Sequence, residues 1–181
     1  MELRNNVDGK EFTGTNGANT TACQAELVIG GATPYVTATL GAAATEVFDS
    51  TGGTSGGVLA GEAYGITVDI VAGTLTIVKS GLYDVELSLD DYANGSATGN
   101  VTFDVQKNAA ALTGTETMSV TRVAATAKAG LVLKRRLALL KGDALRCRVT
   151  NSAAGGTITV TGGVLLVTQV ADSITNKVAP V

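Results

Sequence analysis

Apolar and polar residues alternate with a period of two along much of this chain, most clearly in residues 77–89. Within that stretch one face carries Tyr83, Val85, Leu87 and Leu89, and the other face carries charged or hydroxyl side chains. Because successive side chains of a strand point to opposite faces of a sheet, this alternation predicts a strand with one buried and one solvated face.

Shorter alternating segments follow and are separated by turn residues. Residues 101–106, 145–149 and 157–161 alternate, and Lys141-Gly142-Asp143 is typical of a tight turn. We expect about nine or ten strands at a spacing of roughly 8–12 residues, without a long helix. That arrangement predicts an all-β fold, a sandwich or barrel of antiparallel strands.

One predicted strand near the C-terminus is apolar on both of its faces. It contains Val164, Leu165, Leu166 and Val167. In a two-sheet sandwich, one face of each strand normally meets solvent. The outer face of this strand therefore needs a cover, which is either another subunit or the N-terminal segment of the same chain. We interpret the four residues as part of a subunit interface.

Arg135 interrupts a second apolar pattern. It is the middle residue of Lys134-Arg135-Arg136, the only basic cluster in the sequence. In a regular strand it would lie on the same face as four nearby leucines. Two explanations are open. A β-bulge could shift the register at this point, or Arg135 points at a carboxylate of a partner subunit across an interface.

The first part of the sequence lacks sustained periodicity and is rich in Asn, Gly and Thr. We interpret residues 1–30 as an arm that becomes ordered on a partner, residues 31–170 as the sandwich, and residues 171–181 as a tail. The apolar residues of the arm are the expected docking contacts, and they are Leu3, Val7, Phe12 and Leu27.

Composition narrows the possible partners. Glycine accounts for 23 of 181 residues, and aromatic residues make up only 4%. The formal net charge is −3, and no basic stripe with interleaved aromatic residues exists, which argues against binding to nucleic acid. No apolar run reaches the ~18 residues of a membrane span, and the first residues do not resemble a signal peptide. We therefore expect synthesis in the cytoplasm and no membrane partner.

The sequence also argues against catalysis. It contains no histidine, which excludes Ser-His-Asp and Cys-His systems. A glycosidase would need facing carboxylates in a groove, usually lined with aromatic residues, and nothing marks such a groove. We predict no catalytic residue, no cofactor and no metal site. Asp90 and Asp91 are interpreted as solvated loop charges, with a calcium site as the alternative. Cys147 is interpreted as a core residue, and a Cys23–Cys147 bridge is the alternative to free thiols.

Four segments together resemble a known family. They are residues 73–89, 101–112, 137–149 and 157–170, and in this order they contain Gly81-Leu82-Tyr83, Lys107-Asn108, Gly142-Asp143 and the aliphatic run of residues 163–167. Their order and spacing resemble the C1q/TNF-like jelly roll. The resemblance implies a two-sheet antiparallel jelly-roll sandwich that forms a homotrimer, with the last strand near the threefold axis. Leu75 and Val164 stand where this family usually has Phe.

The composition, rich in Ala, Gly, Thr and Val, resembles tailed-phage structural proteins that use this jelly roll. The resemblance implies a non-enzymatic virion protein. The favoured type is a homotrimeric capsid decoration (cement) protein that binds and stabilises the head shell through its N-terminal arm. Its partner would be the major capsid protein of a phage head, and its place the capsid exterior, after synthesis in the host cytoplasm. The alternative is a head-fibre or tail-tip module that binds a receptor or carbohydrate, with Tyr92 in the loop 91–100 as candidate contact.

Overall fold

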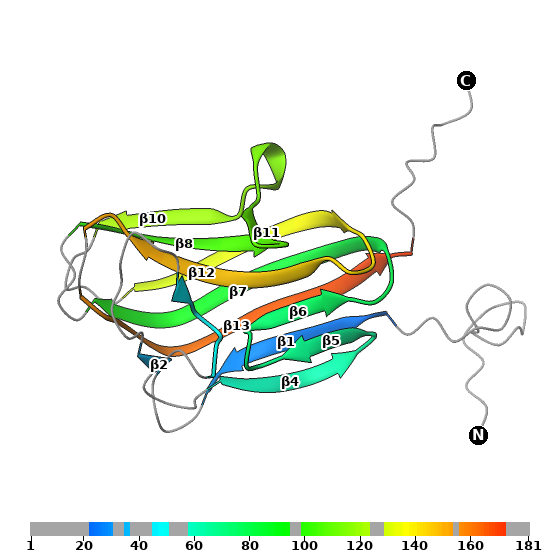
Figure 1. Cartoon of the computed structure of the whole chain (residues 1–181), viewed down its shortest axis with the longest axis horizontal. Helices are drawn as coiled ribbons and strands as arrows, with labels where there is room; N and C mark the ends of the chain where they lie inside the picture. Colours follow the sequence, from blue (N-terminus) through cyan, green and yellow to red (C-terminus); the bar gives the residue numbers. More distant parts are fainter. Residues whose placement is uncertain are drawn as a thin grey trace, which may run out of the picture.

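Two antiparallel sheets pack face to face in the computed structural model, which describes residues 22–30, 35–36, 45–50, 58–94, 99–123, 129–153 and 156–172 (Figure 1). The first sheet contains, in spatial order, β11 (Ala129–Leu139), β7 (Gly81–Asn94), β13 (Ile158–Ala171), β1 (Gln24–Ile29) and β4 (Val58–Tyr64), and β2 (Tyr35–Val36) pairs with β13. The second sheet contains β10 (Ser119–Val123), β8 (Asn100–Lys107), β12 (Ala144–Asn151), β6 (Thr74–Ile77) and β5 (Ile66–Asp69), with β3 (Thr45–Glu46) on β12 and β9 (Ala110–Ala111) on β8. A short 3₁₀ turn, η2 (Gly114–Glu116), lies between β9 and β10. The predicted all-β, two-sheet antiparallel sandwich is confirmed.

Alternating side chains fill the space between the sheets. In β7, the predicted inward residues Tyr83, Val85, Leu87 and Leu89 are at most 1% exposed. Residues 77–89 span the end of one strand and the beginning of the next, because β6 ends at Ile77 in the second sheet and β7 begins at Gly81 in the first. The turn between them therefore carries the chain from one sheet to the other.

Two of the sequence motifs meet at one end of the sandwich. Asn108 follows β8 in a left-handed conformation with φ 53°, and its side-chain N–H donates to Asp143 Oδ1 at 2.7 Å. The Ala144 backbone N–H donates to Asn108 Oδ1 at 2.9 Å. Asp143 also accepts from the Leu140 N–H at 2.9 Å, within a turn where Gly142 has φ 94°. The Lys-Asn and Gly-Asp motifs thus fasten the β8–β9 and β11–β12 turns together.

The Gly81-x-Tyr83 motif packs against the end of β13. A Cβ atom at Gly81 would overlap the Ala171 carbonyl oxygen, so glycine lets the two strands approach closely. The Tyr83 hydroxyl donates to the Lys79 carbonyl oxygen, which satisfies its buried polar group. Burial and the neighbouring Cys23 raise the pKa of Tyr83 to about 12.

The predicted arm needs a correction at its C-terminal end. β1 lies between β13 and β4 in the first sheet, so the sandwich begins well before residue 31. The prediction that Leu27 contacts a partner is wrong, because its side chain is fully buried in the core of its own chain. The other predicted docking residues, Leu3, Val7 and Phe12, lie outside the described residues.

Tyr92 was also predicted in the wrong kind of element. β7 continues to Asn94, so Tyr92 lies in a strand, where its Cα is opposite Val160 of β13 and Ala129 of β11. Asp90 and Asp91 belong to the same strand rather than to a loop.

Cys23 and Cys147 are both buried and both free, so no bridge joins them. No helix within the described part of the chain is long and apolar enough to cross a membrane.

Candidate assembly interface

The outer face of the first sheet carries a row of mainly apolar side chains that crosses all five long strands. Strand register places Leu59, Val28, Val164, Ser88 and Val132 side by side in this order. We call these five residues the apolar row. Leu59 is 53% exposed and Val132 is 64% exposed at its two ends. A contiguous apolar strip on a strand face that normally meets solvent is typical of a contact surface.

Two ion pairs lie beside the apolar row and join β11 to β7. Lys134 Nζ lies 3.0 Å from Glu86 Oε2, and Arg136 Nε lies 2.7 Å from Asp84 Oδ1. The hydrogen bond from Arg136 lowers the pKa of Asp84. Exposed pairs of this kind contribute little to stability, because solvent screens them. Their main effect is to neutralise these charges within one chain, next to the apolar row.

The structure divides the predicted interface residues of β13 between two faces. Leu165 and Val167 are fully buried and point into the core of their own chain, so they cannot contact a partner. Val164 and Leu166 are half-buried on the outer face and remain candidates. β1 is the hydrogen-bonded neighbour of β13 within the same sheet. Residues 24–29 therefore do not cover the outer face of β13.

Arg135 lies on the open side of the sandwich. β4 continues through Gly65 directly into β5, so the chain joins the two sheets on one side. On the other side, β10 and β11 are the outermost strands of their sheets. A hollow of about 280 Å³ lies there, lined by residues 117–119 and 132–135.

The register of β11 decides between the two explanations for Arg135. β11 pairs with β7 without a shift from Leu131 to Leu139, so the β-bulge explanation is wrong. Arg135 lies on the same side of β11 as the inward-facing leucines. It is nevertheless exposed, because β11 is an edge strand and the hollow is open there. Its Nε donates to the Thr117 carbonyl oxygen at 3.4 Å.

The outer face of the second sheet has a different character, which sequence reasoning missed. β3 pairs with β12 within this sheet, and its Glu46 has Oε1 2.9 Å from Arg146 Nη1 and 3.1 Å from Arg148 Nε. Burial raises the pKa of Glu46. Both arginines alternate with buried residues of β12, so they lie on the outer face, where Glu46 of the neighbouring strand pairs with them. The sequence offers no local signal for this contact, because Glu46 and Arg146 are far apart along the chain.

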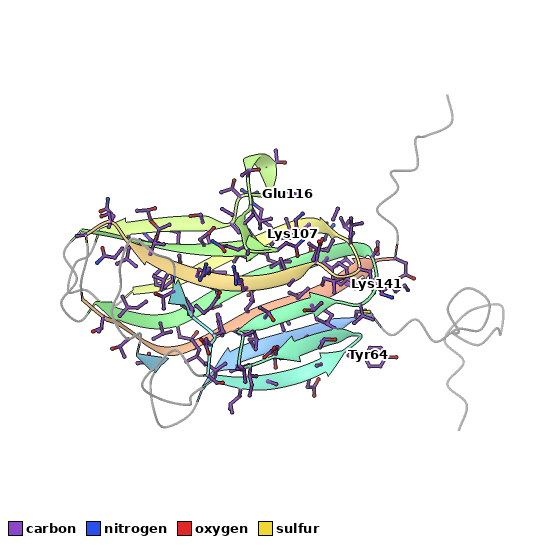
Figure 2. The ribbon with its side chains drawn as sticks, viewed as in Figure 1. Tyr64, Lys107, Glu116 and Lys141 are labelled. Carbon is purple, nitrogen blue, oxygen red and sulfur yellow. The ribbon has the colours of Figure 1, made fainter. Side chains whose placement is uncertain are left out.

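β1 begins and β13 ends at the same end of the sandwich (Figure 1). Two further hollows lie at this end. Both are lined by Ala22, one together with residues 169–172 and the other with Gln24 and residues 62–64. Tyr64 projects from this end, where β4 finishes, and is 54% exposed (Figure 2). Ala22, the first residue that the structure describes, therefore lies between the two hollows. Within the described ranges, no group of His, Cys, Asp and Glu could hold a metal ion.

Comparison with family models and with curated protein sequences finds no match for this chain. Solved structures match its fold. The structure of Eiger TNF from S. frugiperda has a TM-score of 0.58 and 13% identity, over 88% of this chain and 99% of that chain. Murine APRIL at pH 5.0 has a TM-score of 0.53 and 14% identity, over 83% of this chain and 100% of that chain. At this identity the likeness shows the fold alone. The chain thus has the C1q/TNF-like jelly roll that its motifs predicted.

Proposed function

We propose that this chain is a non-enzymatic structural protein of a virion, namely a homotrimeric decoration protein on the exterior of a tailed-phage head. The observation that carries the proposal is the apolar row on the outer face of the first sheet. This face has the strip expected of a surface that another copy covers, while the inner face of the same sheet supplies the chain's own core.

The position of Ala22 supports docking through the N-terminal residues. In a closed oligomer Ala22 of every copy would lie at the same end of its sandwich. Binding only to the assembled shell would stabilise that shell by mass action. Several arms on one oligomer would raise the effective concentration of each arm at its site. The partner in this proposal is the major capsid protein.

The likeness to TNF and APRIL does not bring their biology to this chain, because one fold hosts many unrelated functions. The phage assignment instead draws on composition. The chain is rich in glycine, with 23 residues, and contains only 4% aromatic residues. The lack of histidine in the sequence agrees with a structural role.

Deletion of residues 1–21 tests the docking arm without cutting β1, which begins at Gln24. We expect the truncated protein to keep its circular dichroism spectrum and its oligomeric mass, and to lose co-sedimentation with head shells of the phage that encodes it. The full chain is the matched control. Undiminished co-sedimentation of the truncated protein would contradict the arm. Binding of the full chain to glycans on an array, without binding to shells, would instead favour a head-fibre or tail-tip module.

A further inference from the structure

Arg135 differs from its two basic neighbours. Lys134 and Arg136 each form an ion pair with an acid of β7 in the same chain, at 3.0 and 2.7 Å. Arg135 points to the other side of β11, into the open hollow, where its described polar contact is the uncharged Thr117 carbonyl oxygen. Among the described residues, no carboxylate forms an ion pair with Arg135.

Glu26 is the corresponding acid on the outer face of the first sheet. Its Cα is opposite Leu166 of β13, and the side chain is half-buried. A Cβ atom at Gly61 would overlap the Glu26 carboxylate, so this carboxylate lies over the backbone of β4. Asp84 and Glu86 on the same face have cations beside them. Glu26 has no ion-pair partner in the part of the chain that the structure describes.

The apolar row is continuous with the open side. Val132 is the last residue of the row and also lines the hollow that contains Arg135. Glu26 lies next to the row at its other end, two positions before Val28 in β1. A cation and an anion that form no ion pair with any described residue therefore flank one apolar strip, at different sides of the molecule.

These charges discriminate between two ways of covering the row. If two copies met with their first sheets face to face, Arg135 would stay in solvent, because its side chain points away from that face. Each Glu26 carboxylate would then be covered without Arg135 as its partner, which costs free energy. If the open side of one copy met the face of the next, Arg135 would approach Glu26 and the apolar strip would still be covered.

We propose that Arg135 of one copy pairs with Glu26 of the next copy, and that this pair sets the edge-on-face orientation of the contact. The inference rests on the proposed assembly and names its contact. A contact of this kind uses two different surfaces of each copy, and in the proposed closed oligomer every interface has the same pair.

Charge exchange tests the pair. We expect Arg135→Glu and Glu26→Arg each to weaken assembly at least about tenfold, and the double variant to return to within about threefold of the wild-type value, since coupling across close charge pairs is commonly this large. Native mass spectrometry over a dilution series measures the effect. Glu26→Gln serves as a variant of nearly unchanged size and should weaken assembly less than Glu26→Arg. Lys141→Glu, in an exposed turn, is the control and should assemble normally.

The possible results separate this pair from the proposed function. A wild-type chain that is monomeric at all concentrations would overturn the assembly itself. An oligomeric wild type whose single variants assemble normally would overturn the pair while the assembly stands. A double variant no better than the single variants, with an unchanged circular dichroism spectrum, would also overturn the pair.

Discussion

The outer faces of the two sheets differ, although their inner faces are alike. The first sheet shows the apolar row, with Val132 64% exposed. The second sheet shows hydroxyl and charged side chains, such as Thr102 and Thr121, whose hydroxyl oxygens lie 2.9 Å apart. Both inner faces must be apolar because they form the core. The outer faces are free of that requirement, so their difference favours the first sheet as the contact surface of the proposed assembly.

The energetic consequence of covering each face also differs. Burying a Val or Leu side chain that is otherwise exposed contributes roughly 1.5–3 kcal/mol. Covering a hydroxyl or charged group costs free energy unless the partner supplies a hydrogen bond. The second sheet already satisfies several of its outer groups internally, through Glu46 and its two arginines. A partner would therefore gain more from the first sheet than from the second.

Two adjacent leucines of β13 give the largest expected effect. Leu165 faces the core and Leu166 faces outward, so the same truncation acts on two different surfaces. We expect Leu165→Ala to lower the free energy of unfolding by about 2–5 kcal/mol, because it leaves a cavity. Leu166→Ala should lower it by less than about 1 kcal/mol under conditions where the chain is dissociated. Urea unfolding at one protein concentration measures both. Equal losses would contradict the assignment of the two faces.

A charge placed on each outer face compares the two sheets directly. Val164 lies in the middle of the apolar row, and Thr150 of β12 is similarly half-buried on the outer face of the second sheet. We expect Val164→Asp to weaken assembly by about a hundredfold or more, because an unpaired charge would be buried at the contact. Thr150→Asp should leave assembly within about threefold of wild type. Sedimentation velocity over a dilution series measures both variants. Assembly lost in Thr150→Asp and kept in Val164→Asp would reverse the roles of the two faces.

The sequence was most informative where structure depends on nearby residues. The alternation after Gly81 predicted the buried residues of β7 correctly, because parity along one strand is a local property. Leu27 was misplaced because its strand is short and follows a long polar segment. The positions of Arg135 and Glu46 depend on which strands lie at an edge and which pair across the sheet. Strand order and strand pairing join distant parts of the chain. They therefore cannot be predicted from the alternation of residues within either segment.

The smallest expected effect concerns pH, because carboxylates on the two sheets respond in opposite directions. The hydrogen bond from Arg136 lowers the folded-state pKa of Asp84 on the first sheet. Its contribution to stability is therefore present above the ordinary aspartic acid pKa of about 3.9 and is lost as the pH falls through the lowered folded value. Burial raises the folded-state pKa of Asp104 on the second sheet. Its contribution is present below that ordinary value and is lost as the pH rises through the raised folded value.

The matched variants are Asp84→Asn and Asp104→Asn, each compared with wild type in thermal unfolding between about pH 3 and pH 7, a range that brackets the ordinary aspartic acid pKa. We expect the destabilisation by Asp84→Asn to be greater at pH 7 than at pH 3, because only the ionised carboxylate accepts the hydrogen bonds from Arg136, at 2.7 and 3.2 Å. The destabilisation by Asp104→Asn should be greater at pH 3, because the buried site favours the protonated carboxyl. Parallel pH profiles for the two variants would show that the carboxylates of the two sheets are not held in different environments.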